Sequence, residues 1–392
     1  MPVPDDAGKT RSVNYRGVAV MRILHVTEAI KGGIASYLDE VASFQRFESD
    51  VEQVNFLLPA GWRTDIKSIV SDEVIEFRPV SRNRLKDWKD YCLALKAAIV
   101  TTRPDVVHLH STFPGFIGRP LLRILRFKGV VIYQPHGWSF EMDAAKPLRA
   151  IYLNVERLLQ RWCSKIICLT NYEYGLVSKK RFIPTRLAVI RTGLNEQCQS
   201  GEEDEIKVEG KLKLLFVGRM DRQKGVDNLL KVMSAVRRND IELTIVGAPS
   251  KKSADFEIPK NVQLLGWIPR EKLGLHFGSS DAVVMPSRWE GLPLVALESF
   301  RAGTPVIASS IGALTEIVIP GTSGFTIDFE DHERVVEFFE KLDGLVLRAL
   351  RPSCKKWFHQ NFRSSDMNKK IMNIYRSELS MIGAGANEPV LL

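Results

Sequence analysis

Stretches typical of buried β-strands alternate with amphipathic helical stretches along most of this chain, and that alternation constrains the fold more than any other feature. It runs through residues 21–195, breaks over the polar and acidic residues 196–210, and restarts at residue 211. Closely spaced βα repeats fold into parallel sheets with helices on both faces. The sequence therefore predicts an α/β fold with two tandem doubly wound, Rossmann-like domains and a ligand cleft between them.

The same pattern predicts the boundaries of the parts. We expect a disordered leader over residues 1–20, an N-terminal domain over 21–195, a linker over 196–210, a C-terminal domain over 211–365, and a C-terminal helix and tail over 366–392. The leader lacks the apolar segment of a signal peptide. The expected strands are 22–27, 51–59, 105–111, 130–136, 165–170, 186–193, 212–218, 241–247, 261–268, 281–287 and 304–309, and the clearest helices are 34–45, 225–238, 293–303 and 369–382.

Composition excludes several classes of protein. No apolar run approaches the roughly 18 residues that a membrane-spanning helix needs. The five cysteines are odd in number and contain no C-x-x-C pair, so neither a disulfide framework nor a zinc ribbon is supported. A reducing, cytoplasmic compartment is the simplest expectation.

The positive charge is concentrated in the first half of the chain. Residues 1–200 hold 29 Lys and Arg against 20 Asp and Glu, whereas residues 201–392 hold 26 of each; residues 78–128 alone hold 11 basic and 3 acidic residues. An anionic partner is expected, either nucleic acid, lipid headgroups or an anionic acceptor. No nucleic-acid-binding motif accompanies the charge.

The segment 115–129 favours lipid among these partners. Arg119, Arg123 and Arg126 fall on one helical stripe beside apolar residues, as in helices that lie on anionic membranes. An ordinary crossover helix with its leucines on the sheet and its arginines in water explains the pattern equally well.

The segment SRWEGLPLVALESF (287–300) carries the strongest chemical signal. Pro293 suits the first turn of a helix, so the N–H groups at 291–294 are expected to form an anion site together with the helix dipole. Glu290 lies just ahead of this helix and Glu298 lies one to two turns inside it. A phosphate held by amides and flanked by carboxylates that accept hydroxyl hydrogen bonds describes a sugar nucleotide.

Two loops add phosphate-binding character. In GRMDRQKG (218–225), Arg219 and Lys224 follow a strand end, where two cations would neutralise a diphosphate. In KGG (31–33), Gly32 and Gly33 permit close approach of the backbone to a phosphate, although an ordinary turn explains this pair equally well.

Three histidines complete the candidates. His136 follows a strand in QPHGWSF and is expected at the ligand-binding edge, although a structural role is the common alternative for such a residue. His108 and His110 are expected to point to opposite faces of their strand, to serve packing, and to form no metal pair. No D-x-D follows a strand, so we expect no metal site.

Together, KGG, PHG, GRMDRQKG and EGLPLVALE resemble the retaining glycosyltransferases of the GT-B fold, family 4, over about residues 21–365. The opening HVTEAIKGGIASYL and the QPHGWSF loop look most like the enzymes of bacterial exopolysaccharide and capsule assembly. The chain departs from the family pattern at IRTGLN (190–195) and at Ala313, where a second glycine is common.

The resemblance implies a role for each matching residue. His136 and Glu290 would be the catalytic residues, contacting the transferred sugar. The donor-binding residues would hold the diphosphate, the ribose and the base, with the base resting near Gly266–Ile268. They are Gly32, Gly33, Arg219, Lys224, Ile268, Gly291, Leu292 and Glu298.

The implied reaction moves a hexose from a nucleotide diphosphate sugar, with UDP favoured, to a lipid-linked or saccharide acceptor in cell-surface polysaccharide synthesis. No cofactor or metal is expected, because fixed cations and helix-end dipoles would stabilise the departing diphosphate. The N-terminal domain would take the acceptor and bind anionic inner-leaflet lipid, which would place the enzyme on the cytoplasmic face of the inner membrane. No nucleic acid is expected.

Two other classes compete with this interpretation. A sugar-nucleotide epimerase of the same fold would need acid and base residues at the sugar and no acceptor site, and the basic first half argues against it. A non-catalytic anion- or nucleic-acid-binding protein would be indifferent to the loss of Glu290.

Overall fold

The computed structural model describes residues 3–4, 10–11, 20–28, 30, 32–62, 66–79, 85–197, 210–249 and 256–385. The chain divides into two compact domains. The N-terminal domain contains the chain up to Leu169, then Tyr174–Arg191 and the C-terminal segment from Ser364; the C-terminal domain contains Thr170–Glu173 and Thr192–Arg363. Most of the predicted leader and linker lies outside the described residues, apart from a two-stranded antiparallel pair, β1 (Val3–Pro4) and β2 (Thr10–Arg11).

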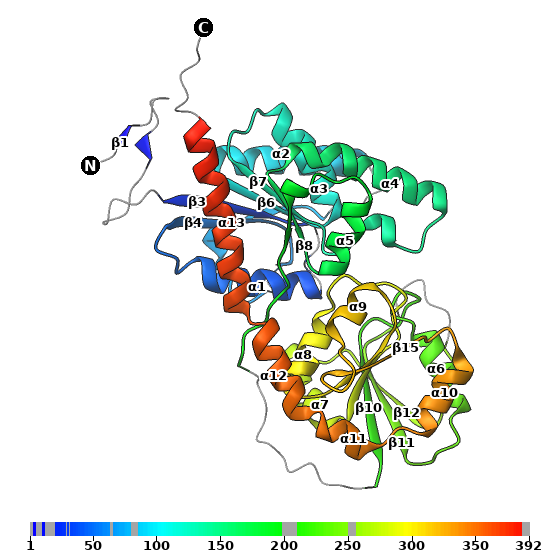
Figure 1. The fold of residues 1–392 in the computed structure, drawn as a ribbon. Coiled ribbons are helices and arrows are strands. Elements are labelled where there is room, and N and C mark those ends of the chain that lie inside the picture. Colours follow the sequence, from blue (N-terminus) through cyan, green and yellow to red (C-terminus); the bar gives the residue numbers. More distant parts are fainter. Residues whose placement is uncertain are drawn as a thin grey trace. The chain divides into compact units, whose positions relative to one another are not determined.

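The N-terminal domain is built on a seven-stranded parallel sheet with the order β5-β4-β3-β6-β7-β8-β9 (Figure 1). Helices α1 and α13 cover one face, and α2, α3 and α4 cover the other. The strands are β3 (Met21–Val26), β4 (Val51–Pro59), β5 (Val74–Phe77), β6 (Val106–His110), β7 (Val130–Gln134), β8 (Lys165–Cys168) and β9 (Leu187–Val189). The helices are α1 (Gly33–Gln45), α2 (Leu85–Thr102), α3 (Thr112–Ile124), α4 (Lys146–Leu159), α5 (Asn171–Lys179) and α13 (Ser364–Gly385).

The C-terminal domain has a six-stranded parallel sheet with the order β12-β11-β10-β13-β14-β15. Its strands are β10 (Leu212–Val217), β11 (Ile241–Val246), β12 (Val262–Gly266), β13 (Ala282–Met285), β14 (Val306–Ser309) and β15 (Gly324–Ile327). Its helices are α6 (Val226–Ala235), α7 (Arg270–Ser279), α8 (Leu294–Ala302), α9 (Gly312–Ile317), α10 (His332–Glu340), α11 (Gly344–Ala349) and α12 (Arg351–Asn361).

Both sheets therefore have the doubly wound order that the sequence predicts, with the strand order reversing between β3 and β6 in one domain and between β10 and β13 in the other. Ligands of such sheets bind outside the carboxyl ends of the strands at this switch point. Strands β5 and β15, at sheet edges, were not expected from the sequence pattern. The predicted cleft between the domains stays a prediction.

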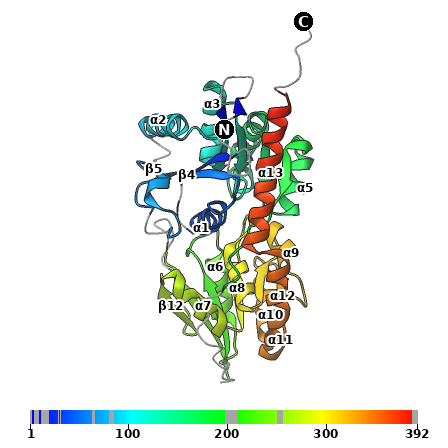
Figure 2. The same cartoon turned by 90° about the vertical axis from the view of Figure 1, so that its left-hand side faces the viewer.

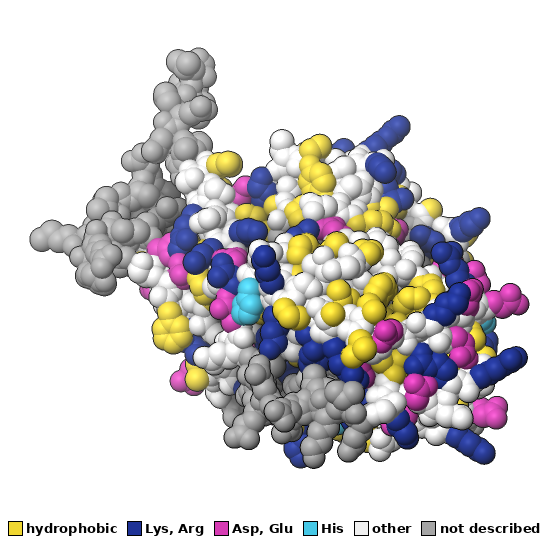
Figure 3. All heavy atoms as spheres, turned by 60° about the horizontal axis from the view of Figure 1, so that its bottom comes forward, with side chains coloured by type: hydrophobic (Ala, Val, Ile, Leu, Met, Phe, Trp, Pro, Cys, Tyr) yellow, Lys and Arg dark blue, Asp and Glu magenta, His cyan; other side chains and the backbone are white. Residues whose placement is uncertain are grey.

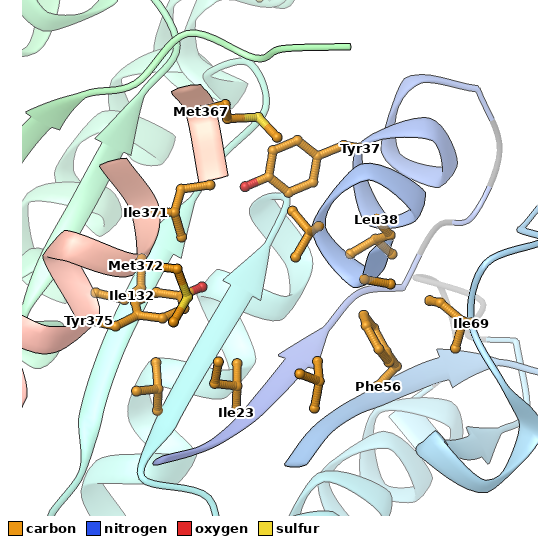
Figure 4. Close-up of a cluster of buried hydrophobic side chains, with 14 of the residues drawn as sticks. Ile23, Tyr37, Leu38, Phe56, Ile69, Ile132, Met367, Ile371, Met372 and Tyr375 are labelled. Carbon is orange, nitrogen blue, oxygen red and sulfur yellow. The ribbon is translucent and has the colours of Figure 1, made fainter. Parts of the chain in front are cut away.

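Helix α13 completes the core of the N-terminal domain, although its sequence lies at the other end of the chain. Met367, Ile371, Met372 and Tyr375 are all buried in this core; Figure 4 draws Met372 and Tyr375 beside Ile132 of β7, and Met367 beside Tyr37 of α1. Figure 1 and Figure 2 both draw α13 beside α1, its neighbour on this face. The helix that the sequence assigns to a separate C-terminal part is thus an integral layer of the first domain.

Helix α3 differs from the expected arginine stripe. Arg119 is fully buried, its guanidinium lies 4.0 Å from the centre of the Tyr133 ring, and its NH2 lies 2.7 Å from Glu156 Oε2. Gly115 brings the helix this close, because a Cβ there would lie 2.2 Å from the ring of Tyr133. The expectation that Arg119 faces an anionic surface is wrong, since an opposite charge and an aromatic ring hold it inside the domain; Arg123 remains exposed.

Within the described residues, no helix is both long and apolar enough to cross a membrane. On the face drawn in Figure 3, Lys and Arg side chains lie among exposed hydrophobic and acidic ones.

Candidate active site

Two loops meet at the switch point of the C-terminal sheet. The loop after β10 carries GRMDRQKG, and the loop after the neighbouring β13 carries PSRWEGLP. Gly225 ends the first loop with φ 67°, and a Cβ at this position would lie 1.9 Å from the carbonyl oxygen of Pro286. Only glycine fits both the conformation and the contact, so the two loops are held backbone to backbone.

Lys224 and Glu290 come together at this contact. Lys224 Nζ lies 2.5 Å from Glu290 Oε1, and the hydroxyl of Ser287 donates to the same oxygen over 2.8 Å. The Glu290 side chain is 7% exposed and that of Lys224 is 20% exposed. The structure thus pairs two predicted site residues with each other, as a largely desolvated ion pair at the mouth of the sheet.

Arg219 lies on the same loop with a more open environment. Its side chain is 54% exposed; its NH2 group donates to Gln223 Oε1 over 2.8 Å and lies 3.1 Å from Asp221 Oδ2. Gln223 in turn donates to the carbonyl oxygen of Trp289 over 3.3 Å, which ties this loop to the segment ahead of α8. Arg219 is therefore a positioned but accessible cation.

Arg288 is a residue of this region whose role the sequence did not reveal. It forms a two-pronged ion pair with Asp227, with N–O distances of 2.7 and 2.8 Å, and its Nε lies 2.9 Å from Glu330 Oε1. The carboxylates hold the pKa of Arg288 above its ordinary value and Arg288 lowers that of Asp227 against the effect of burial. This network fixes the loop that carries Glu290, and nothing in the spacing of the three residues signals it.

Helix α8 begins one residue later than predicted. Pro293 is its N-cap and Leu294 its first residue, so Pro293 lies outside the first turn. The predicted run of N–H groups is interrupted at Pro293, which has none. Gly291 and Leu292 immediately precede the helix, and no acidic side chain occupies its first turn, so the helix-end dipole is available to an anion.

Glu298 lies on α8, just over one turn from its start, and is 8% exposed. Burial raises the pKa of this carboxyl, while Arg270 and Arg301 oppose the shift; Arg270 Nε lies 3.5 Å from Glu298 Oε1. Ile268 lies in the loop between β12 and α7 and is half-buried, next to Trp267, which is 61% exposed. Trp267 is an exposed ring beside the position that the sequence assigns to a base.

In the N-terminal domain, Gly32 and Gly33 form the turn from β3 into α1. Gly32 is the N-cap with φ 68°, and Gly33 is the first helical residue. Both are exposed, and a Cβ at Gly32 would meet no atom within 4 Å. The backbone is therefore open to a ligand here; Lys31 lies outside the described residues.

His136 follows β7 at the same carboxyl edge of the N-terminal sheet. Its φ of 55° is unusual for a residue with a side chain. Its Nε2 lies 3.1 Å from His110 Nδ1, and burial lowers the pKa of His136 to about 3. The imidazole is therefore neutral over the physiological range.

The expectation that His108 and His110 point to opposite faces of their strand is wrong. Both rings lie on the α1 and α13 side of β6, stacked with centroids 4.1 Å apart, because residues two positions apart in a strand share a face. With His25 on β3 they form a buried cluster whose ring nitrogens lie within 4.8 Å of one another. Among the His, Cys, Asp and Glu residues of the described part of the chain, these three histidines are the group that could hold a metal ion.

The ring geometry of this cluster favours hydrogen bonding over ligation. The planes of His25 and His108 each lie within 30° of the His110 plane, and the nitrogen lone pairs lie in those planes. His25 Nδ1 and His110 Nε2 are 2.9 Å apart, which is an ordinary hydrogen-bond distance. Burial lowers the pKa of His25 to about 4 and holds those of His108 and His110 well below the ordinary value.

Comparison with known proteins places this architecture in a family. Residues 32–197 match the family described as Glycosyltransferase Family 4, and residues 201–343 match Glycosyl transferases group 1. An uncharacterized 41.2 kDa protein of the cps region of Klebsiella pneumoniae is 30% identical over 91% of this chain and 100% of its own length. The Escherichia coli UDP-Gal:alpha-D-GlcNAc-diphosphoundecaprenol alpha-1,3-galactosyltransferase is 27% identical over 74% of this chain and 80% of its own.

The fold matches solved structures as well. Sucrose-phosphate synthase from Thermosynechococcus elongatus superposes with a TM-score of 0.78 at 19% identity, covering 92% of this chain and all of the other. The two doubly wound domains, the loops at their switch points and these similarities agree with one another. The chain belongs to glycosyltransferase family 4 and is a glycosyltransferase with the GT-B fold.

Proposed function

We propose that this chain is a retaining hexosyltransferase that moves a hexose from a UDP-linked donor to a lipid-linked or saccharide acceptor in cell-surface polysaccharide synthesis. The observation that carries the proposal is the contact between the loop that carries Arg219 and Lys224 and the segment just ahead of α8, at the switch point of the C-terminal sheet. Two cations and a helix N-terminus converge where a diphosphate is expected to bind. The name of the Escherichia coli relative, a galactosyltransferase that uses UDP-Gal, supports the choice of donor.

In this proposal the C-terminal domain binds the nucleotide. Arg219 and Lys224 neutralise the diphosphate, and the N–H groups of Gly291 and Leu292 help to bind the donor beside the start of α8. Glu298, buried beside Arg270, accepts hydrogen bonds from the ribose hydroxyls. The base lies against the backbone at Ile268.

A second set of residues lies near the transferred sugar and its bond to the phosphate, which breaks in the reaction. Glu290 accepts hydrogen bonds from hydroxyl groups of the sugar, held in place by Ser287 and Lys224. Gly32 and Gly33 lie against the distal phosphate, and neutral His136 lies beside the reacting carbon. As the sugar–phosphate bond stretches, the carbon gains positive and the phosphate negative charge, which Arg219 and Lys224 stabilise. The departing phosphate takes the proton of the acceptor on the same face, and no metal is needed.

Sugar transfer tests this proposal directly. Purified protein is incubated with UDP-, GDP- and ADP-hexoses and an undecaprenyl-diphosphate-linked sugar, with EDTA present, and the anomeric configuration of the product is determined by NMR. We expect one UDP-hexose to be used with retention, and Glu290→Gln to lower kcat about a hundred- to a thousandfold. The matched control is Glu257→Gln, which replaces an exposed carboxylate that has no role in the proposal. Inversion of configuration, or loss of transfer with EDTA, would contradict the mechanism.

We also propose that the N-terminal domain binds anionic lipid on the cytoplasmic face of the inner membrane. Ile124 on α3 is 75% exposed, and Ile151 and Leu158 on α4 are 57% and 55% exposed. A hollow of about 490 Å³ opens beside the end of α3. Its basic lining residues are Arg123, Arg161 and Arg186, and no acidic residue lines it.

The positively charged hollow suits the phosphate of a lipid headgroup, and the exposed apolar side chains of α3 and α4 suit its hydrocarbon part. Flotation with phosphatidylglycerol vesicles tests it, with phosphatidylcholine vesicles as the neutral comparison. We expect binding to anionic vesicles that Arg161→Glu weakens at least fivefold, whereas Lys356→Glu, the same charge change on α12, leaves it unchanged. Equal binding of both variants would refute a role for the hollow.

A further inference from the structure

A chain of hydrogen bonds runs through the N-terminal domain from helix α1 to His136. Gln45 Oε1 lies 2.9 Å from His25 Nε2, and His25 Nδ1 lies 2.9 Å from His110 Nε2. His110 Nδ1 in turn lies 3.1 Å from His136 Nε2. The chain therefore crosses α1, β3 and β6 and ends in the loop after β7, the edge where the sugar is proposed to bind.

The chain is enclosed by groups without charge. Gln45, His25 and His110 are fully buried. The ring of Phe56 on β4 stacks on His25 with centroids 5.3 Å apart, and Tyr37 on α1 meets His136 edge-on at 5.0 Å. Among the described residues, the other titratable groups that face the hydrogen-bonded chain are Tyr37, His108 and, from α13, Tyr375. Burial holds the pKa of each tyrosine well above, and that of His108 well below, its ordinary value. The imidazoles of His25, His110 and His136 in the chain, and of His108 beside it, are thus neutral.

Neutral rings, together with the orientation of the Gln45 amide, fix the direction of every hydrogen bond. A neutral imidazole carries one N–H and one bare nitrogen, and the carbonyl oxygen of Gln45 only accepts. His25 must then carry its hydrogen on Nε2 and accept at Nδ1 from His110. His110 likewise carries hydrogen on Nε2 and accepts at Nδ1 from His136.

The last imidazole therefore has its hydrogen on Nε2 and a bare Nδ1. Within the described part of the chain, Nδ1 of His136 has no hydrogen-bond partner. We propose that Gln45, His25 and His110 are positioning residues that orient the unprotonated Nδ1 of His136 to accept a hydrogen bond from a hydroxyl group of the transferred sugar. This inference rests on the proposed function in placing the sugar beside His136.

The physical advantage lies in charge and in orientation. A neutral imidazole does not repel the positive charge that develops on the sugar carbon, whereas an imidazolium would. The bond to His110 also fixes the ring of a residue whose backbone, at φ 55°, is in an unusual conformation. His108 lies outside this chain: its Nδ1 is 2.6 Å from the hydroxyl of Tyr375, and its ring meets His25 and His110 through ring packing.

The tautomers can be measured without any substrate. Two-bond ¹H–¹⁵N correlation spectra of ¹⁵N-histidine-labelled full-length protein distinguish the Nε2–H, Nδ1–H and charged forms of each ring. The His136 signal is assigned by its loss in the His136→Asn variant. We expect His136, His110 and His25 to be Nε2–H tautomers from pH 6 to pH 8. In the Gln45→Met variant, which lacks the amide acceptor, we expect the three rings no longer to share this tautomer. A hydrogen on Nδ1 of His136, or a charged ring at pH 6, would overturn the proposal, as would micromolar binding of added Zn²⁺ that shifts the His25, His108 and His110 signals.

Paired variants test whether the chain matters for transfer. Asn and Leu have similar shapes, but the amide oxygen of Asn can accept where Nδ1 of His110 accepts. We expect His110→Leu to lower kcat about ten- to a hundredfold and His110→Asn to recover most of it. The same two substitutions at His108 are the matched controls, and we expect them to change kcat less than threefold.

The outcomes separate this inference from the proposed function. If the wild-type protein transfers no sugar but shows the expected tautomers, the proposed function fails and the hydrogen-bonded chain stands. If the wild-type protein transfers sugar and His110→Leu matches it in kcat, or if the His108 variants lose as much, the positioning role is overturned. Circular dichroism identifies variants that do not fold, and Gln45→Met then replaces them as the test of kcat.

Discussion

Acid should destabilise the N-terminal domain through its buried histidines, and His25 allows the size of the effect to be worked out. Its pKa is about 4 in the folded protein, against 6.5 for an unperturbed histidine, because burial disfavours the charged ring. Between these two values the unfolded chain binds a proton that the folded chain does not. The free energy of unfolding therefore falls as the pH is lowered through this window and is fully retained above pH 6.5.

At pH 5, unfolded His25 is almost fully protonated and folded His25 is largely neutral. With about 1.4 kcal/mol per pH unit, this one residue costs the folded state about 2 kcal/mol relative to pH 7. That is a large fraction of the 5–15 kcal/mol by which domains are typically stable. His136, with a pKa of about 3, acts in the same direction.

Urea unfolding of the wild-type protein and of His25→Gln at pH 7 and pH 5 measures the effect. Glutamine keeps a polar group in the site but does not titrate, so the loss of unfolding free energy between the two pH values should be about 2 kcal/mol smaller in the variant. If both proteins lose the same amount, the buried-histidine reasoning is refuted. An NMR titration in which His25 protonates above pH 6 would refute it as well.

Three further perturbations have expected outcomes. Glu156→Ala leaves the Arg119 guanidinium buried without a counter-charge and should lower the free energy of unfolding by about 3–5 kcal/mol, measured by urea denaturation. The double variant in which Arg119 is also replaced by Met should lose less. Gly225→Ala forces a Cβ against the carbonyl of Pro286 and should abolish the binding of UDP, measured by calorimetry, while far-ultraviolet circular dichroism keeps its helical signal. Deletion of residues 364–385 removes a layer of the first core and should expose its amides to hydrogen exchange, while those of β10–β15 stay protected.

The sequence predicted the architecture because local patterns encode it. Buried strands are apolar runs and crossover helices are amphipathic, so two βα series and the break between them were readable without contacts. Of the edge strands, β9 and β12 were expected, whereas the four-residue strands β5 (Val74–Phe77) and β15 (Gly324–Ile327) were missed. The expected strand over residues 186–193 ends at Val189, since pairing with β8 ends there.

The sequence also located the candidate site residues, but not their partners. Arg219, Lys224 and Glu290 could be found because they follow strand ends, and strand ends of a parallel sheet meet at one edge. That Lys224 pairs with Glu290, 66 positions away, follows only from β10 and β13 being neighbours and from the glycine contact at Gly225. Their assigned roles in donor binding and catalysis stay predictions.

By itself, then, the sequence determined the fold class, the two domains and the loops that carry polar chemistry, because periodicity and strand-end position are local properties. Only the tertiary structure decided that Arg119 is buried, that α13 returns to the first domain, and that His25, His110 and His136 are joined by hydrogen bonds. These features depend on which elements pack together across long stretches of chain. His108 and Tyr375 are hydrogen-bonded although 267 positions apart, and spacing could not reveal this contact. It exists only after α13 has packed on the face of the sheet to which His108 of β6 points.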